Sequence, residues 1–208
     1  MSTPFDRNLL PEFESVKDAD EEILWSGKPR FIPFIFSGLG VALYTLLFGA
    51  VWVITSLNVP HQDDGMGRWF WLFGLVAMAQ GFFPWINKVL SFPNTVYAYS
   101  DKRVMMRTGF IGTDFKVIDY DKISDIEVTV NLLERMYNVG TVRFFSGRTK
   151  SDEDSTSKLY DTWTAISDPY GVFKLVKQTS VDIKTDYNYP NALRPDTNPG
   201  YKTKYEKK

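Results

Sequence analysis

The sequence predicts a membrane protein whose other part is an α+β domain: a hairpin of two transmembrane helices, then a β-rich domain closed by a C-terminal helix. Two long apolar runs without charged residues lie close together in the first half of the chain. Behind them, short runs of β-branched and aromatic residues alternate with turn residues, which is typical of strands. A length of 208 residues leaves room for one domain beside such a hairpin.

The first apolar run, residues 31–57, contains no Asp, Glu, Lys or Arg. It exceeds the roughly 20 residues that cross ~30 Å of hydrocarbon as a helix. A buried helix of a soluble protein, the alternative, would carry a polar stripe at helical spacing. Gly38, Gly40 and Gly49 are small residues of the kind that let membrane helices pack closely. The run therefore predicts a transmembrane helix.

The second apolar run, residues 69–87, is also uncharged and just long enough to span. Pro84 lies near its end and removes a helical hydrogen bond, so we expect the helix to end or bend there. Trp69, Trp71 and Trp85 bracket the run as interfacial anchors.

The charges around the two runs predict their orientation. The segment 58–68 carries Arg68 against Asp63 and Asp64, and His61 within it is expected to be solvated. The basic residues nearest to the hairpin outside this segment are Arg7, Lys17, Lys28, Arg30, Lys88, Lys102, Arg103 and Arg107. By the positive-inside rule both termini are cytoplasmic. We expect no cleavable signal peptide, because the first run begins too far along the chain and is too long.

The region after the hairpin predicts six strands and a final helix. The strands are expected at residues 95–99, 103–107, 115–120, 123–130, 141–145 and 161–166. A helical turn is expected at 131–137, and the polar segment 146–158 is expected to be an exposed, mobile loop. Ser167, Asp168 and Pro169 start a helix over 170–181, and an extended tail follows from residue 185.

Composition argues against several kinds of function. A net charge of −1 provides no broad positive field for nucleic acid. The absence of cysteine excludes thiolate metal sites and cysteine nucleophiles, and one histidine leaves no triad base in the β-rich domain. Asp119, Asp121, Asp125 and Glu127 are best interpreted as solvated strand edges. We expect no catalytic residue, metal site or cofactor.

Several short motifs resemble one family. They are Glu21–Pro29 before the first run, Tyr99–Val104 with Gly109 after the second, Leu133–Arg135 with Val139–Val142, and Asp168–Pro169 before the last helix. In this order they resemble the bacterial pleckstrin-homology (PH)-like membrane proteins, over about residues 21–181. The resemblance implies a sandwich or barrel of two packed antiparallel sheets, with seven strands and a C-terminal helix. The seventh strand would be short or lie near residues 110–113.

Four basic residues are the candidate contacts for lipid headgroups or a partner: Lys102, Arg103, Arg107 and Arg135. Alternatively, the first three satisfy membrane topology and pair with Asp101 or Asp114. Arg135 matches a position of the family motif, and an internal ion pair that holds its turn is favoured there over a partner contact.

These features predict a non-catalytic interaction or scaffold module at the cytoplasmic face of the bacterial inner membrane. Its parts are an N-terminal segment (1–30), the hairpin (31–90), the PH-like domain (91–183) and a tail (184–208). It binds membrane lipid through the hairpin, and binds unidentified protein partners or further copies of itself, since the resemblance implies oligomers. The alternative is a protein that binds or handles anionic lipid. A membrane enzyme would need converging carboxylates that the sequence does not indicate.

Overall fold

The computed structural model describes residues 11–58, 69–152 and 155–188. The chain forms two compact units. One is residues 31–94, and the other combines the chain up to Arg30 with the chain from Thr95 onward. His61, its neighbours between the apolar runs and the tail beyond residue 188 lie outside the described residues.

The first unit is a pair of helices, α1 (Phe31–Asn58) and α2 (Phe70–Ser91), followed by the short η3 (Phe92–Asn94). Both helices are long and apolar enough to cross a membrane, judged by length and composition. Of the expected end or bend near Pro84, the end is wrong, since α2 continues through this proline to Ser91. Contacts with α1 hold the last turns: Trp85 Nε1 donates to the Ile35 carbonyl at 3.2 Å, and Lys88 donates to the Ser37 hydroxyl.

Glycines bring the two helices close together. A Cβ on Gly74 would lie 2.8 Å from the carbonyl oxygen of Gly49, and a Cβ on Gly81 would overlap Thr45. A Cβ on Gly40, by contrast, would meet nothing within 4 Å. The expected role of small residues in helix packing therefore holds for Gly49, whereas Gly40 has no such neighbour.

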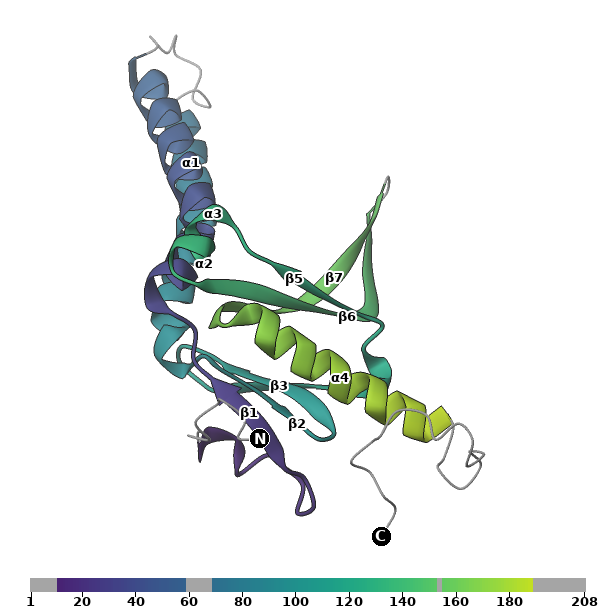
Figure 1. Ribbon diagram of the computed structural model, residues 1–208. Coiled ribbons are helices and arrows are strands. Elements are labelled where there is room, and N and C mark those ends of the chain that lie inside the picture. The colour runs from purple at the N-terminus through teal and green to yellow at the C-terminus, as the bar shows by residue number, and fades with distance from the viewer. Residues whose placement is uncertain (1–10, 59–68, 153–154, 189–208) are drawn as a thin grey trace, which may run out of the picture. The chain divides into compact units, whose positions relative to one another are not determined.

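The second unit contains two antiparallel sheets (Figure 1). The first has the order β1 (Ile23–Gly27), β2 (Val96–Ser100), β3 (Arg103–Thr108) and β4 (Asp114–Asp119). The second has the order β5 (Asp125–Thr129), β6 (Val139–Asp152) and β7 (Ser155–Ser167). The shorter elements are η1 (Pro11–Phe13), η4 (Tyr120–Lys122) and α3 (Leu132–Met136), and α4 (Pro169–Asn188) is the final helix. No ladder joins the sheets within the described residues, so the closed-barrel option is wrong.

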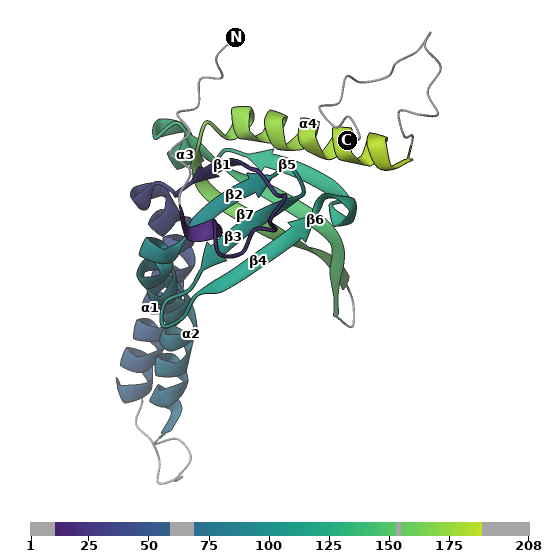
Figure 2. The ribbon, with the colours of Figure 1, turned by 90° about the horizontal axis from the view of Figure 1, so that it is seen from below.

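One core fills the space between the two sheets and α4. Trp163 of β7 is fully buried at its centre, and its ring stacks on Trp25 at 5.5 Å and on Tyr97 at 5.7 Å. Val172 and Val176, one helical turn apart on α4, complete this core. Figure 2 shows α4 lying along the sheets.

The N-terminal segment covers the outer face of the first sheet. Phe13 of η1 is fully buried against Val96, Ala98 and Met105. Because alternate residues of a strand face opposite sides, β2 is therefore buried on both faces. From residue 11 onward, the N-terminal segment is therefore packed onto the second unit.

Three other expectations differ from the structure. The seventh strand is β1, whereas residues 110–112 form a bend. Residues 146–152 and 155–158 are strand and not loop: β6 and β7 stay paired out to Asp152 opposite Ser155, because a ladder of backbone hydrogen bonds needs no apolar side chains. The last helix continues to Asn188, since Ile183 packs on the core and Lys184 donates to the Ile123 carbonyl at 2.5 Å.

Candidate functional site

The antiparallel register determines at which end of the first sheet each connection between strands lies. Gly27 at the end of β1 lies opposite Tyr97 at the start of β2, and Thr108 faces Asp114 across the β3–β4 turn. The exits toward α1 and from α2 thus share one end of the sheet with this turn, and we name it the connection end. The β2–β3 turn lies at the opposite end, which we name the far end.

Lys102 and Arg103 lie at the far end, where acidic residues of the N-terminal segment bind them. Arg103 donates to the buried Glu21 carboxylate through Nε at 2.9 Å and Nη2 at 2.5 Å. Its Nη2 is also 3.0 Å from Asp18, and Lys102 Nζ lies 2.7 Å from Asp20. The sequence did not indicate these partners, because they stand about 80 positions away along the chain.

We name the residues Asp18, Asp20, Glu21, Lys102 and Arg103 the far-end cluster, and its central pair, Glu21 and Arg103, stabilises the charged form of each partner. Burial alone would raise the pKa of Glu21, but hydrogen bonds from Arg103, from the Ser100 hydroxyl and from the Asp18 amide outweigh it and lower the pKa to about 2. The hydrogen bond between Glu21 and Arg103 also raises the pKa of Arg103. A lipid phosphate would have to compete with three carboxylates for these two cations. The cluster therefore connects the N-terminal segment to the β2–β3 turn.

Arg107 is separated from this cluster. It stands four residues after Arg103 on β3, about 13 Å away along the strand. Its guanidinium lies over the Phe115 ring at 5.9 Å, and Nη1 is 4.0 Å from Glu12. The structure thus does not bring the three basic residues of β3 and its turn together into one cationic site.

Arg135 lies at the connection end, on the short helix α3, whose geometry explains the Leu-Glu-Arg motif. Asn131 caps the helix by accepting from the Glu134 amide at 2.8 Å, and the Glu134 carboxylate accepts from the Asn131 amide at 2.9 Å. The other oxygen of the buried Glu134 accepts from the Thr141 hydroxyl at 2.5 Å. Glu134 thus fixes α3 to β6, while Arg135 points outward and is exposed.

The remaining motif residues meet beside α3. A Cβ on Gly140 would lie 2.7 Å from Pro169 and 2.8 Å from Val130. Only glycine therefore fits at this position of β6 without displacing these two side chains. The Arg30 amide donates to the Ala165 carbonyl of β7 at 2.8 Å. This bond places the last residue before α1 at the same end of the second sheet as α3 and the start of α4.

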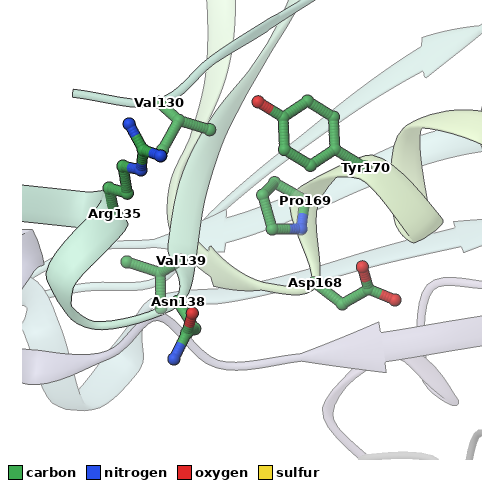
Figure 3. A pocket seen from close by; sticks show the side chains of 7 residues that line it. All are labelled: Val130, Arg135, Asn138, Val139, Asp168, Pro169 and Tyr170. Atoms are coloured by element: carbon green, nitrogen blue, oxygen red, sulfur yellow. The ribbon is translucent and has the colours of Figure 1, made fainter. Parts of the chain in front are cut away.

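An open hollow of about 390 Å³ lies at this end. Its lining residues are Val130, Arg135, Asn138, Val139, Asp168, Pro169 and Tyr170. Figure 3 shows Pro169 and Tyr170 next to each other, with Arg135 across from them. Among the described residues no carboxylate lies within ion-pair distance of Arg135, so the internal ion pair favoured from the sequence is absent there.

Sequence reasoning missed the exposed apolar residues of the connection end. Ile111 in the β3–β4 turn and Leu132 and Met136 on α3 are largely exposed. The spacing of Leu132 and Met136 by four positions was the available signal, because such residues share one helix face. Within residues 11–58, 69–152 and 155–188, no three His, Asp or Glu side chains converge closely enough to hold a metal ion.

The architecture defines the class: two apolar helices joined to a sandwich of four and three antiparallel strands with a C-terminal helix. The family described as "Bacterial PH domain" matches residues 35–164, more than half of the chain. The chain therefore belongs to the bacterial PH domain family.

One solved structure resembles the chain more distantly. It is a DUF1696 family protein with a pleckstrin-homology domain from Shewanella loihica PV-4, with 14% identity and a TM-score of 0.29. The match covers 41% of this chain and 71% of that one, and it is too remote to add to the assignment. A search of curated proteins found no match.

Proposed function

We propose that this protein is a membrane-anchored, non-catalytic interaction module, in which α1 and α2 span the bacterial inner membrane and the PH-like domain binds partners at the cytoplasmic face. The domain's membership of the bacterial PH family supports an interaction role.

The observation that carries the anchor is the exposed apolar surface of the two helices. Large side chains on both helices point away from the partner helix, among them Val41, Leu47, Val51, Phe73 and Phe83. Soluble proteins rarely expose contiguous apolar patches of this extent, whereas lipid is the solvent in which such a surface is stable. Both termini are cytoplasmic in this proposal, because the basic residues near the hairpin other than Arg68 lie outside the segment between the helices.

A polar β arm is the surface we propose for protein partners. It consists of the outer parts of β6 and β7, from Thr149 paired with Lys158 to Asp152 paired with Ser155. Figure 1 shows this arm extending away from the sandwich. Its side chains at 149–151 and 156–158 are exposed, and two isolated strands are marginally stable in water, so an added strand from a partner or a second copy would stabilise it.

Photo-crosslinking in native membranes tests the partner proposal. A photoreactive amino acid at Ser157 in the arm is compared with one at Thr179, a partly exposed position of α4. We expect a discrete crosslinked product from position 157, identified by mass spectrometry as a second copy or another protein, and none from position 179. Equal, diffuse products at both positions would contradict the arm as the contact surface.

The alternative function, binding of anionic lipid, has support at a different place from the one the sequence suggested. Lys102 and Arg103 are already paired with carboxylates, whereas Arg135 is exposed beside apolar side chains.

A further inference from the structure

The connection end of the PH-like domain presents large apolar side chains to solvent from two separate segments. Ile111 in the β3–β4 turn is 93% exposed, and its neighbour Phe110 is also exposed. On α3, Leu132 is 81% and Met136 is 73% exposed. Such concentrated exposure of large apolar side chains on two short segments is unusual for a domain surface.

Strand register and one backbone bond place both segments at the same end. The β3–β4 turn adjoins the exits of β1 and β2, as the pairing of Thr108 with Asp114 and of Gly27 with Tyr97 requires. The Arg30 amide bonds to Ala165, three residues before Asp168, which begins the turn into α4 beside α3. Both apolar segments therefore flank the points where the chain leaves the domain for α1 and returns from α2.

Short connections restrict what can face this end. Only residues 28–30 separate β1 from α1, and such a segment spans about 14 Å at most. Only Thr95 separates η3 from β2. If α1 and α2 span a bilayer, both connections keep this end within the reach of the headgroup layer.

We propose that the connection end rests in the interfacial layer of the bilayer, with Ile111, Leu132 and Met136 inserted between lipids and Arg135 contacting lipid phosphates. Interfacial surfaces of this kind combine protruding apolar side chains with nearby cations. The exposed Arg135 lies one residue from Met136 on α3 and supplies that cation. This inference rests on the proposed anchor and adds a second membrane contact, which would hold the domain in one orientation on the membrane.

Fluorescence of single labelled cysteines in vesicles tests this proposal. The chain contains no cysteine, so Leu132→Cys, Ile111→Cys, Asp121→Cys and Leu47→Cys each give one labelling site in the full chain. Asp121 follows β4 at the far end and is exposed, and Leu47 lies on α1. Each variant carries an environment-sensitive dye and is reconstituted into vesicles of neutral and anionic phospholipid, with and without nitroxide-labelled lipids.

We expect the dye at positions 111 and 132 to emit at shorter wavelength and to be quenched by lipids with a shallow nitroxide, while the dye at position 121 shows neither change. Leu47 lies near the middle of α1, so its quenching by lipids with a nitroxide deep in the acyl chain tests the anchor separately. If 47 is quenched and 111 and 132 are not, this inference is wrong while the anchor stands. If 47 is not quenched, the anchor itself fails. A blue shift at 132 without lipid quenching would show burial against protein, for example a second copy, and would overturn the inference.

Arg135→Gln in the Leu132→Cys background tests the phosphate contact. We expect quenching at position 132 to be stronger in anionic than in neutral vesicles, and this difference to be lost in the variant. Lys122→Gln at the far end serves as the matched control. An undiminished difference after Arg135→Gln would remove Arg135 from the proposed surface.

Discussion

At the residue scale, the buried carboxylate of Glu21 decides how the far end is held together. It is 4% exposed and accepts from Arg103, Ser100 and the Asp18 amide. We predict that Glu21→Gln destabilises the full chain in detergent by about 1–3 kcal/mol, because the amide cannot satisfy the two guanidinium donors and leaves them partly unpaired. The measurement is the midpoint of thermal unfolding.

The matched control for this variant is Asp20→Asn, which removes the partner of Lys102 at an exposed position. Exposed ion pairs contribute little to stability, so we expect no measurable change in the midpoint. An equal decrease of the midpoint in both variants would contradict the claim that the burial of Glu21 makes its ion pair more stabilising than the exposed one.

The same carboxylate predicts a dependence on pH. The pKa of Glu21 is about 2 in the folded chain, against 4.5 for an ordinary glutamate. Because the folded pKa is the lower one, its stabilisation is complete above pH 4.5 and is lost as the pH falls toward 2. We therefore expect the difference in midpoint between the natural chain and Glu21→Gln to be constant near neutral pH and to shrink below pH 4.5. A difference that stays constant down to pH 2.5 would contradict this assignment.

At the scale of elements, helix packing depends on which glycines face the partner helix. A Cβ on Gly74 would meet the backbone oxygen of Gly49 at 2.8 Å and Val53 at 2.8 Å. We predict that Gly74→Ala destabilises the hairpin by about 1–3 kcal/mol, because backbone on both sides must separate. The measurement is thermal unfolding in detergent followed by circular dichroism.

Gly40→Ala is the control on the other helix, since a Cβ there meets nothing within 4 Å. Alanine also favours helix over glycine, so we expect this variant to be neutral or slightly more stable. A loss of stability from Gly40→Ala as large as that from Gly74→Ala would contradict the observed helix contact.

Local pattern predicted the elements whose signals are local. Both apolar helices, the strands from Val96 to Thr129, the α3 turn and the start of α4 follow from runs, turns and caps in the sequence. The Leu-Glu-Arg motif was visible too, although Glu134 is its structural residue and Arg135 its exposed one.

Long-range pairing could not be predicted in the same way. β1 has no alternating pattern, and it becomes a strand because Trp25 stacks on Trp163 and its backbone pairs with β2. The outer parts of β6 and β7 are as polar as a loop and are recognisable only from their partner strand. The acids that bind Lys102 and Arg103 are likewise distant in sequence. A single sequence does not reveal such pairs.

At the scale of the whole molecule, the two helices are an insertion into a sheet. β1 precedes α1 and β2 follows α2, yet they are neighbouring strands of one ladder. The hairpin therefore joins the PH-like domain by two connections at the same end of that ladder. Such double attachment limits the rotation of a domain more than a single linker does.

The central claim, a hairpin that spans the membrane with the domain on the cytoplasmic side, is tested most directly by cysteine accessibility in intact bacteria. A cysteine at position 64, between the helices in sequence, and a cysteine at Ser157 in the β arm are exposed in turn to a membrane-impermeant maleimide. We predict that Asp64→Cys is labelled in intact spheroplasts and that Ser157→Cys is labelled only after lysis. Labelling of Ser157→Cys in intact spheroplasts, or recovery of the chain in the soluble fraction, would contradict the account.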